Sequence, residues 1–135
     1  MNLSAHFTLA EFTRSEYAQR KGLDNSIPTA LMSNAKRIAM LMEQVRATLN
    51  IGLLYPKANI IICNSMYRSP AVNKVVGGSS KSYHLKALAC DFVCPSFGTP
   101  YQVAKAIEAS NIIYDQLIYE GTWVHIGLAD ELKTA

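Results

Sequence analysis

The chain has 135 residues, of which 50% are hydrophobic and 17% are charged, and its formal net charge is +3. This composition argues against a disordered chain, and the length suffices for one core, so we expect residues 1–135 to form a single domain. The Lys and Arg residues form no dense block with interleaved aromatics, which argues against a nucleic-acid partner.

The N-terminus and the cysteines bear on the compartment. The segment Met1–Phe7 lacks the basic and apolar regions of a secretory signal, and no apolar run approaches the roughly 18 residues of a membrane span. We therefore expect no signal peptide and no membrane insertion. Cys63, Cys90 and Cys94 are odd in number and form no CxxC motif, which predicts unpaired core thiols in a reducing compartment.

The N-terminal part of the chain favours helices. Thr8 and Glu11 have the spacing of a capping box, which predicts a helix from Thr8 to about Arg20 that Gly22 ends. Pro28 opens a longer helix, since proline is favoured at the first helical position. Its predicted buried face consists of apolar residues at helical spacing, namely Leu31, Ile38, Met42, Val45 and Leu49.

The middle of the chain alternates short elements with loops. A turn is expected over 52–57, and the β-branched run at 59–63 predicts a buried strand. A short helix is expected over 70–76, with Ser69 as its N-cap and a proline in its first position. The glycines and serines of 77–80 then predict a flexible loop.

The C-terminal part favours strands around one helix. Apolar runs at 88–94, 114–119 and 123–128 predict three strands, the last two as a hairpin, and Thr99-Pro100 begins a helix between the first two. The polar tail from Asp130 is expected to fray. Helices first and strands later predict an α+β fold, with N-terminal helices packed on a small, mainly antiparallel sheet.

Three side chains have the character of a metal-ligand set. His84 follows the glycine-serine loop, Asp91 lies inside a predicted strand, and His125 lies in the last strand. Two imidazoles and one carboxylate are a usual catalytic zinc set, which leaves a fourth position for water. Considered alone, His84 has the alternative of being a surface residue. His125 has the alternative of being a core histidine whose ring is fully hydrogen-bonded. A carboxylate buried without a cation or donors, in contrast, is costly.

Strand parity points to a candidate general base. If residues 121–122 form a two-residue turn, Ile118 lies opposite His125, and Glu120 is a diagonal neighbour of His125 with Cα atoms about 7–8 Å apart. A carboxylate there can reach a water on a metal that His125 holds, as a general base must. The alternatives are a solvated turn residue, or a bulge that reverses the parity.

Further motifs surround these residues. They are Ser65-Met66-Tyr67-Arg68-Ser69, Ser82-Tyr83-His84, Ala89-Cys90-Asp91-Phe92 and Trp123-Val124-His125-Ile126, together with Leu3–Phe12 and Asp115–Ile118. Across nearly the whole chain these motifs resemble the M15 metallopeptidases, the D-Ala-D-Ala carboxypeptidase-type group that includes phage endolysins and peptidoglycan-trimming enzymes. The resemblance is to small phage and prophage members, and it implies a D-Ala-D-Ala carboxypeptidase/Hedgehog-like fold.

The resemblance also implies roles for particular residues. His84, Asp91 and His125 match the zinc ligands of the family. Arg68 matches an arginine used near the substrate or the metal-bound carbonyl, where a guanidinium suits a carboxylate or a developing oxyanion. A surface salt bridge is its alternative.

Two polar residues also match family positions near the substrate. Ser82 matches a serine that hydrogen-bonds substrate or orders the loop. Gln116 matches a glutamine that faces the site, for substrate contact, for packing or for support of a ligand.

The chain departs from the family pattern at two positions. Ala87 stands where many members carry glycine, which an extended backbone would tolerate. Thr122 stands where several branches place the catalytic acid, and threonine cannot act as the base. Glu120 is the predicted substitute.

The expected activity is zinc-dependent hydrolysis of peptidoglycan stem or cross-link peptides. One alternative is a non-catalytic wall-binding or phage structural module that keeps the fold, and another is a D-Ala-D-Ala dipeptidase. We expect a monomer that stays in the host cytoplasm until release, or is carried in a phage particle, and acts on the cell wall. The mild positive charge suits such a polyanionic neighbour.

Overall fold

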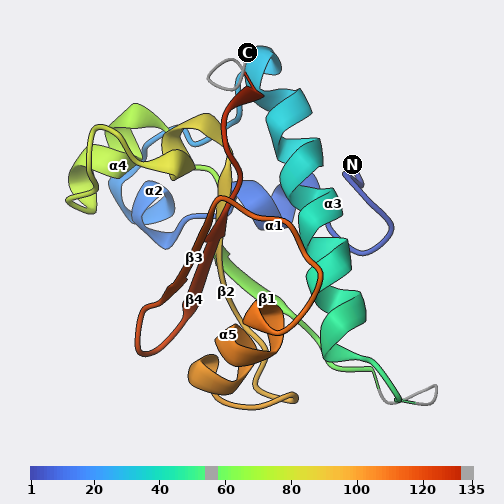
Figure 1. Ribbon diagram of the computed structural model, residues 1–135. Helices are drawn as coiled ribbons and strands as arrows, with labels where there is room; N and C mark the ends of the chain where they lie inside the picture. Colours follow the sequence, from blue (N-terminus) through green and yellow to red (C-terminus); the bar gives the residue numbers. More distant parts are fainter. Residues whose placement is uncertain (54–57, 132–135) are drawn as a thin grey trace.

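A four-stranded antiparallel sheet lies at the centre of the molecule, in a computed structural model that describes residues 1–53 and 58–131 (Figure 1). The strand order is β1-β2-β4-β3, with β1 (Ile62–Ser65), β2 (Ala89–Val93), β3 (Gln116–Tyr119) and β4 (Val124–Gly127). The helices are α1 (Leu9–Thr13), α2 (Glu16–Lys21), α3 (Met32–Leu49), α4 (Pro70–Val75) and α5 (Pro100–Glu108), with 3₁₀ turns η1 (Thr29–Leu31) and η2 (Tyr83–Lys86). The predicted α+β class, with N-terminal helices and an antiparallel sheet, is confirmed.

The two faces of the sheet differ in character. Side chains alternate along a strand, so Cys90 and Phe92 of β2 point to one face while Asp91 points to the other. The first face is completely buried and packs with α3 and α5 in one apolar cluster. In Figure 1, α3 runs along this side of the sheet, whereas α2 and α4 lie together on the other side. The second face is therefore left for polar groups.

The predicted helix from Thr8 to Arg20 is wrong in one respect, because it is two helices. The capping box at Thr8 forms, but α1 ends at Thr13, and Arg14 is extended. Ser15 then caps α2, because its hydroxyl oxygen accepts a hydrogen bond from the Ala18 amide. A serine whose side chain offers this bond favours a new helix start over continuation of the old one. Gly22 ends α2 in the left-handed conformation, as predicted.

The long helix begins slightly later than predicted. Pro28 precedes the 3₁₀ turn η1, and α3 starts at Met32 and continues to Leu49. The predicted buried face is confirmed for Ile38, Met42, Val45 and Leu49, which are at most 2% exposed, and Leu31 packs against the core from η1.

The strand predicted as buried at 59–63 is instead a half-exposed edge strand. It is paired over Ile62–Ser65, and β1 is the outer neighbour of β2. Ile60 is 70% exposed and Ile62 is 44% exposed, whereas Ile61 and Cys63 between and beside them are buried. The run of β-branched residues therefore predicted the strand but not its place at the edge of the sheet, where one face stays exposed to solvent.

The remaining elements agree with the sequence predictions. Ser69 caps α4, and Thr99 with Gln102 forms a capping box on α5. The three cysteines are buried and unpaired, with the Cys63 and Cys90 sulfurs 3.2 Å apart. None of the helices in the described ranges has the length and apolar character needed to cross a membrane.

Two predictions fall partly or wholly outside the described residues. The turn expected over 52–57 is described only at 52–53, where residues 51–52 do form a turn. At the start of the tail, Lys86 pairs with Asp130 at 3.2 Å and Arg37 pairs with Glu131 at 3.3 Å, and the predicted fraying stays a prediction. Residues 132–135 lie outside the description.

Candidate metal centre

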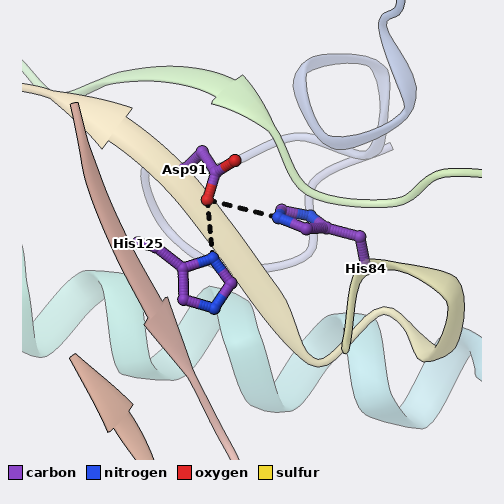
Figure 2. A group of neighbouring side chains, drawn as sticks. All are labelled: His84, Asp91 and His125. Carbon is purple, nitrogen blue, oxygen red and sulfur yellow. Dashed lines mark hydrogen bonds and ion pairs between the residues drawn. The ribbon is translucent and has the colours of Figure 1, made fainter. Parts of the chain in front are cut away.

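Three elements bring His84, Asp91 and His125 together on the polar face of the sheet (Figure 2). Asp91 of β2 and His125 of β4 are direct partners in the antiparallel register, so their side chains project side by side. His84 comes from η2, the 3₁₀ turn just before β2. One potential ligand atom from each residue lies within 4.8 Å of the others. A single ion could therefore touch all three.

The turn that carries His84 is fixed at its start by a side chain and at its end by a backbone conformation. Ser82 caps it, because its hydroxyl oxygen accepts a hydrogen bond from the His84 amide at 3.2 Å. Ala87 closes it with φ 56°, the left-handed region that glycine favours. The backbone at Ala87 is therefore not extended, so the condition under which alanine would replace glycine without strain is not met. The alanine adopts a conformation that costs an L-residue roughly 1–2 kcal/mol.

His84 is held by the main chain. Its Nδ1 lies 2.8 Å from the Met66 carbonyl oxygen, and the residue is 2% exposed. A carbonyl oxygen only accepts, so Nδ1 carries the proton and Nε2 is left with a lone pair in the neutral ring. Within the described residues this buried Nε2 has no hydrogen-bond partner of acceptable geometry, although Asp91 Oδ1 lies 3.2 Å away. His84 is therefore neither a surface residue nor a satisfied core histidine.

His125 is held by a side chain. Its Nε2 lies 2.8 Å from Gln116 Oε1, and its Nδ1 lies 2.8 Å from Asp91 Oδ1. Donation of the Nε2 proton to Gln116 leaves the Nδ1 lone pair facing the carboxylate. A ligand histidine typically gives its second N–H to an oxygen in this way, which fixes its tautomer and orientation.

The protonation of these groups tests whether a metal fits. Each imidazole has an oxygen near both nitrogens, and the two inner nitrogens lie beside the same oxygen, Asp91 Oδ1. Protonated imidazole around one carboxylate would suit such an arrangement, and so would a cation among three unprotonated ligand atoms. Two nitrogens and a carboxylate oxygen are donors that zinc accepts. The residues therefore fit a zinc ion.

The ionisation of Asp91 suits this arrangement. Burial raises the pKa of Asp91, but contacts with the protonated forms of His125 and His84 outweigh burial and bring the pKa to about 2. The carboxylate is thus charged at neutral pH and available as a ligand.

Arg68 and Ser82 lie beside the cluster. Arg68 donates from Nη2 to the Ser82 hydroxyl oxygen at 2.9 Å. Burial lowers the pKa of the Arg68 guanidinium, and the negative charge of Asp91 acts in the opposite direction. The Asp91 carboxylate is thus close enough to act on the Arg68 charge, and no salt bridge between the two is present in the described part of the chain.

Glu120 lies at the end of the hairpin. The register has Ile118 opposite His125, and the Glu120 amide donates to the Trp123 carbonyl at 3.0 Å, as a two-residue turn at Gly121-Thr122 requires. Glu120 therefore shares a face with His125. Its carboxylate is exposed and does not belong to the three-residue group that the described residues form.

Comparison with known proteins agrees with this geometry. The sequence model of the family described as Peptidase M15 matches residues 5–127, which is most of the chain. The chain belongs to the M15 peptidase family. A search of curated proteins finds no match. The matched span of this M15 chain contains all three cluster residues, and the family points to a peptidase.

Asn25, a buried residue of this M15 chain, fixes the segment around Arg68 and was not predicted from the sequence. Its Nδ2 donates to the Thr13 carbonyl at 2.8 Å and to the Tyr67 carbonyl at 3.1 Å, and its Oδ1 accepts from the Ser69 amide at 2.7 Å. Asn25 thus binds the chain on both sides of Arg68. A polar residue in a polar loop carries no sequence signal of such a role.

Gly127 is the second missed residue. A Cβ at this position would lie 3.0 Å from the Tyr83 ring, 3.1 Å from Gln116 Oε1 and 3.2 Å from the Leu88 carbonyl oxygen. These contacts are tighter than ordinary van der Waals separation. The absence of a side chain at position 127 therefore lets Gln116 sit where it meets His125, and a glycine within a strand is the signal that could have found it.

Proposed function

We propose that this M15 chain is a zinc-dependent peptidase that hydrolyses stem or cross-link peptides of peptidoglycan, with residues 1–135 acting as one monomeric peptidase domain. The main support is the convergence of two imidazoles on one carboxylate oxygen while the outer nitrogen of each ring is already bonded to another oxygen. In a peptidase family, three such ligand atoms suit a catalytic zinc better than a structural one, because the fourth position remains open.

In this proposal the metal is held by His84 Nε2, His125 Nδ1 and an Asp91 carboxylate oxygen. When bound, zinc polarises the scissile carbonyl and lowers the pKa of a bound water to about 7. Gln116 orients the His125 ring by accepting its Nε2 proton, and the Met66 carbonyl does the same for His84. Gln116 therefore acts as support for a ligand rather than as a substrate contact.

The remaining roles belong to the residues around the cluster. Glu120 accepts the proton of the attacking water on its carboxylate and returns it to the leaving amine. Arg68 stabilises the negative oxygen that develops on the scissile carbonyl, and Ser82 holds the Arg68 guanidinium in place through its hydroxyl oxygen. Arg68 and Ser82 also offer hydrogen-bonding groups to substrate.

The proposed site of action is the cell wall. We place the protein in the host cytoplasm until release, or in a phage particle, and its net charge of +3 favours approach to a polyanionic wall.

Digestion of purified peptidoglycan tests the proposal. The zinc-loaded protein is expected to release peptide fragments with new amino termini, detected by mass spectrometry, and a chelator should stop the release. Added zinc should restore the release of fragments. Release that is insensitive to chelator, or wall binding without any release, would contradict the proposal, and the second result would favour the non-catalytic module. Preferential cleavage of free D-Ala-D-Ala would favour the dipeptidase.

Glu120→Gln tests the base. Turnover should fall by at least about 100-fold, the lower range for a general base, while the zinc content stays unchanged. Glu108→Gln, an exposed glutamate on α5, is the matched control and should keep full activity. Full activity of the Glu120 variant would assign the proton transfer to another group.

A further inference from the structure

Two hollows meet at the hydrogen bond between Arg68 and Ser82. One has a volume of about 620 Å³ and lies between α2, the end of β1 and α4, with Arg68 in its wall. We call it the α2 hollow. The other has a volume of about 570 Å³ and lies along η2, with Ser82 in its wall. Both volumes are within the usual range for ligand sites. His84, Asp91 and His125 line neither hollow, but the Arg68–Ser82 bond lies beside their cluster.

Two polar side chains of the η2 hollow are paired already, whereas the exposed Lys81 in the same wall forms no ion pair in the described ranges. The Tyr83 hydroxyl donates to Asp115 at 2.5 Å, and Lys86 pairs with Asp130 at 3.2 Å. A ligand entering there would have to compete with these bonds.

The α2 hollow carries unpaired charges. Arg14 and Glu16 stand exposed at its outer side, and in the described ranges neither forms an ion pair. At its inner side Arg68 Nε is buried and has no hydrogen-bond partner among the described residues. Two guanidinium groups and one carboxylate leave the lining with a positive balance, which favours an anionic ligand.

An irregularity in β1 also places the polar residue Asn64 in the wall of this hollow. The strand pairs Cys63 with Phe92 and Ser65 with Asp91, so Asn64 between them is the extra residue of a β-bulge. Bulges next to active sites commonly re-aim a side chain. Asn64 is exposed and lines the α2 hollow, and Ser65 connects it to Asp91 of the metal cluster. The hollow therefore lies next to the proposed site of hydrolysis, because Ser65 in its wall is the register partner of Asp91.

We propose that the α2 hollow is a substrate subsite, which binds a peptide arm with a free carboxylate away from the scissile bond through Arg14 and the Asn64 amide. This inference rests on the proposed function, because it assumes that the substrate is a peptide of the wall. Because Arg14 would pair with that carboxylate, the subsite selects acidic peptides over amidated ones.

Binding measurements test the subsite without turnover. Zinc-loaded Glu120→Gln protein is titrated calorimetrically with a synthetic wall stem peptide and with the same peptide whose branch carboxylates are amidated. Amidation should weaken binding about 3- to 5-fold, as expected for one exposed charge pair. Adding Arg14→Gln should abolish that difference. Lys21→Gln removes the same charge from α2 outside the hollow and should preserve it.

Three results would overturn the subsite: equal binding of both peptides, equal behaviour of the Arg14 and Lys21 variants, or no binding of either peptide. Asn64→Ala is a second variant at an exposed position and should weaken both peptides. The digestion assay separates the two proposals. If the protein cleaves the wall but Arg14→Gln does not change peptide selectivity, only the subsite is contradicted. If peptides bind selectively but no cleavage occurs, only the proposed hydrolysis is contradicted.

Discussion

The η2 turn and the β3–β4 hairpin supply the two histidines of the cluster in different ways. The His84 side chain is 3% exposed and bonds to a backbone carbonyl, whereas the His125 side chain is 12% exposed and bonds to the Gln116 side chain. The orientation of His84 therefore depends on the path of the main chain, while that of His125 depends on one amide. Substitutions should disturb the two regions through different observables, namely stability for the turn and metal affinity for the hairpin.

The η2 turn is tied to the segment around Arg68 by reciprocal bonds. The His84 ring bonds to the Met66 carbonyl, and the Arg68 amide donates to the His84 carbonyl at 3.1 Å. Asn25 fixes the same segment from the other side. Substitution of Asn25 should therefore make the orientation of His84 less fixed, although Asn25 and His84 are not bonded to each other.

Asn25→Ala is expected to have the largest effect on stability. It leaves two carbonyls and one amide without their buried partner, so the free energy of unfolding should fall by about 3 kcal/mol in urea titration. Hydrogen exchange should accelerate at 67–69 and remain slow in β3 and β4.

The control is Asn34→Ala, which removes one exposed bond to the Lys86 carbonyl and should cost less than about 1 kcal/mol. Uniform acceleration of exchange across the sheet in the Asn25 variant would show that the two regions are not separate.

Asp91 joins the two regions, and its pKa gives a pH test in chelator-treated protein. A carboxyl whose pKa is about 2 when folded and near 3.8 when unfolded contributes stability that is fully present above pH 3.8 and is lost as the pH falls through 2. The stability advantage of the parent over Asp91→Asn should shrink by about 2 kcal/mol between pH 6 and pH 2, with roughly half lost by pH 3. An advantage that is independent of pH would contradict the ionic contacts.

Gln116→Ala should weaken zinc binding about 10-fold, because the His125 ring loses the acceptor that fixes its tautomer. Competition with a chromogenic chelator measures the affinity. Gln44→Ala, at an exposed position of α3, should bind zinc like the parent protein. An unchanged affinity in the Gln116 variant would mean that the hairpin orients His125 without that amide.

Ala87→Gly should have the smallest effect. Glycine relieves the left-handed strain of about 1–2 kcal/mol, but it removes a fully buried methyl group and adds unfolded-state entropy. The free energy of unfolding should therefore change by less than about 1 kcal/mol in thermal or urea unfolding. A loss above 2 kcal/mol would indicate that the methyl group, rather than the backbone, sets the turn.

Local patterns were sufficient for much of the fold. Capping residues such as Thr8 and Ser69 and the turn at Gly121-Thr122 act within a few residues, so their elements were predictable. The register that sets His125 beside Asp91 also follows from alternation once the strands are paired. The three-residue cluster is close to what residue types and family motifs indicated, whereas the catalytic role of Glu120 stays a prediction.

The errors share a different cause, since they depend on contacts between distant segments. The break between α1 and α2 is reinforced by Asn25, which bonds to the last carbonyl of α1. The exposure of Ile62 depends on β1 being an edge strand, and the turn at Ala87 depends on how η2 enters β2. None of these contacts produces a periodic pattern of residues from which it could be predicted.

The strand order has a consequence for biosynthesis. β4 leaves the ribosome last of the four strands but lies between β2 and β3, and it delivers the third ligand to a pair that η2 and β2 have already presented. A nascent chain that stops short of residue 123 holds an incomplete chelate and an open edge on β2. A chain assembled in this order lacks the complete group of His84, Asp91 and His125 until synthesis has passed the final hairpin.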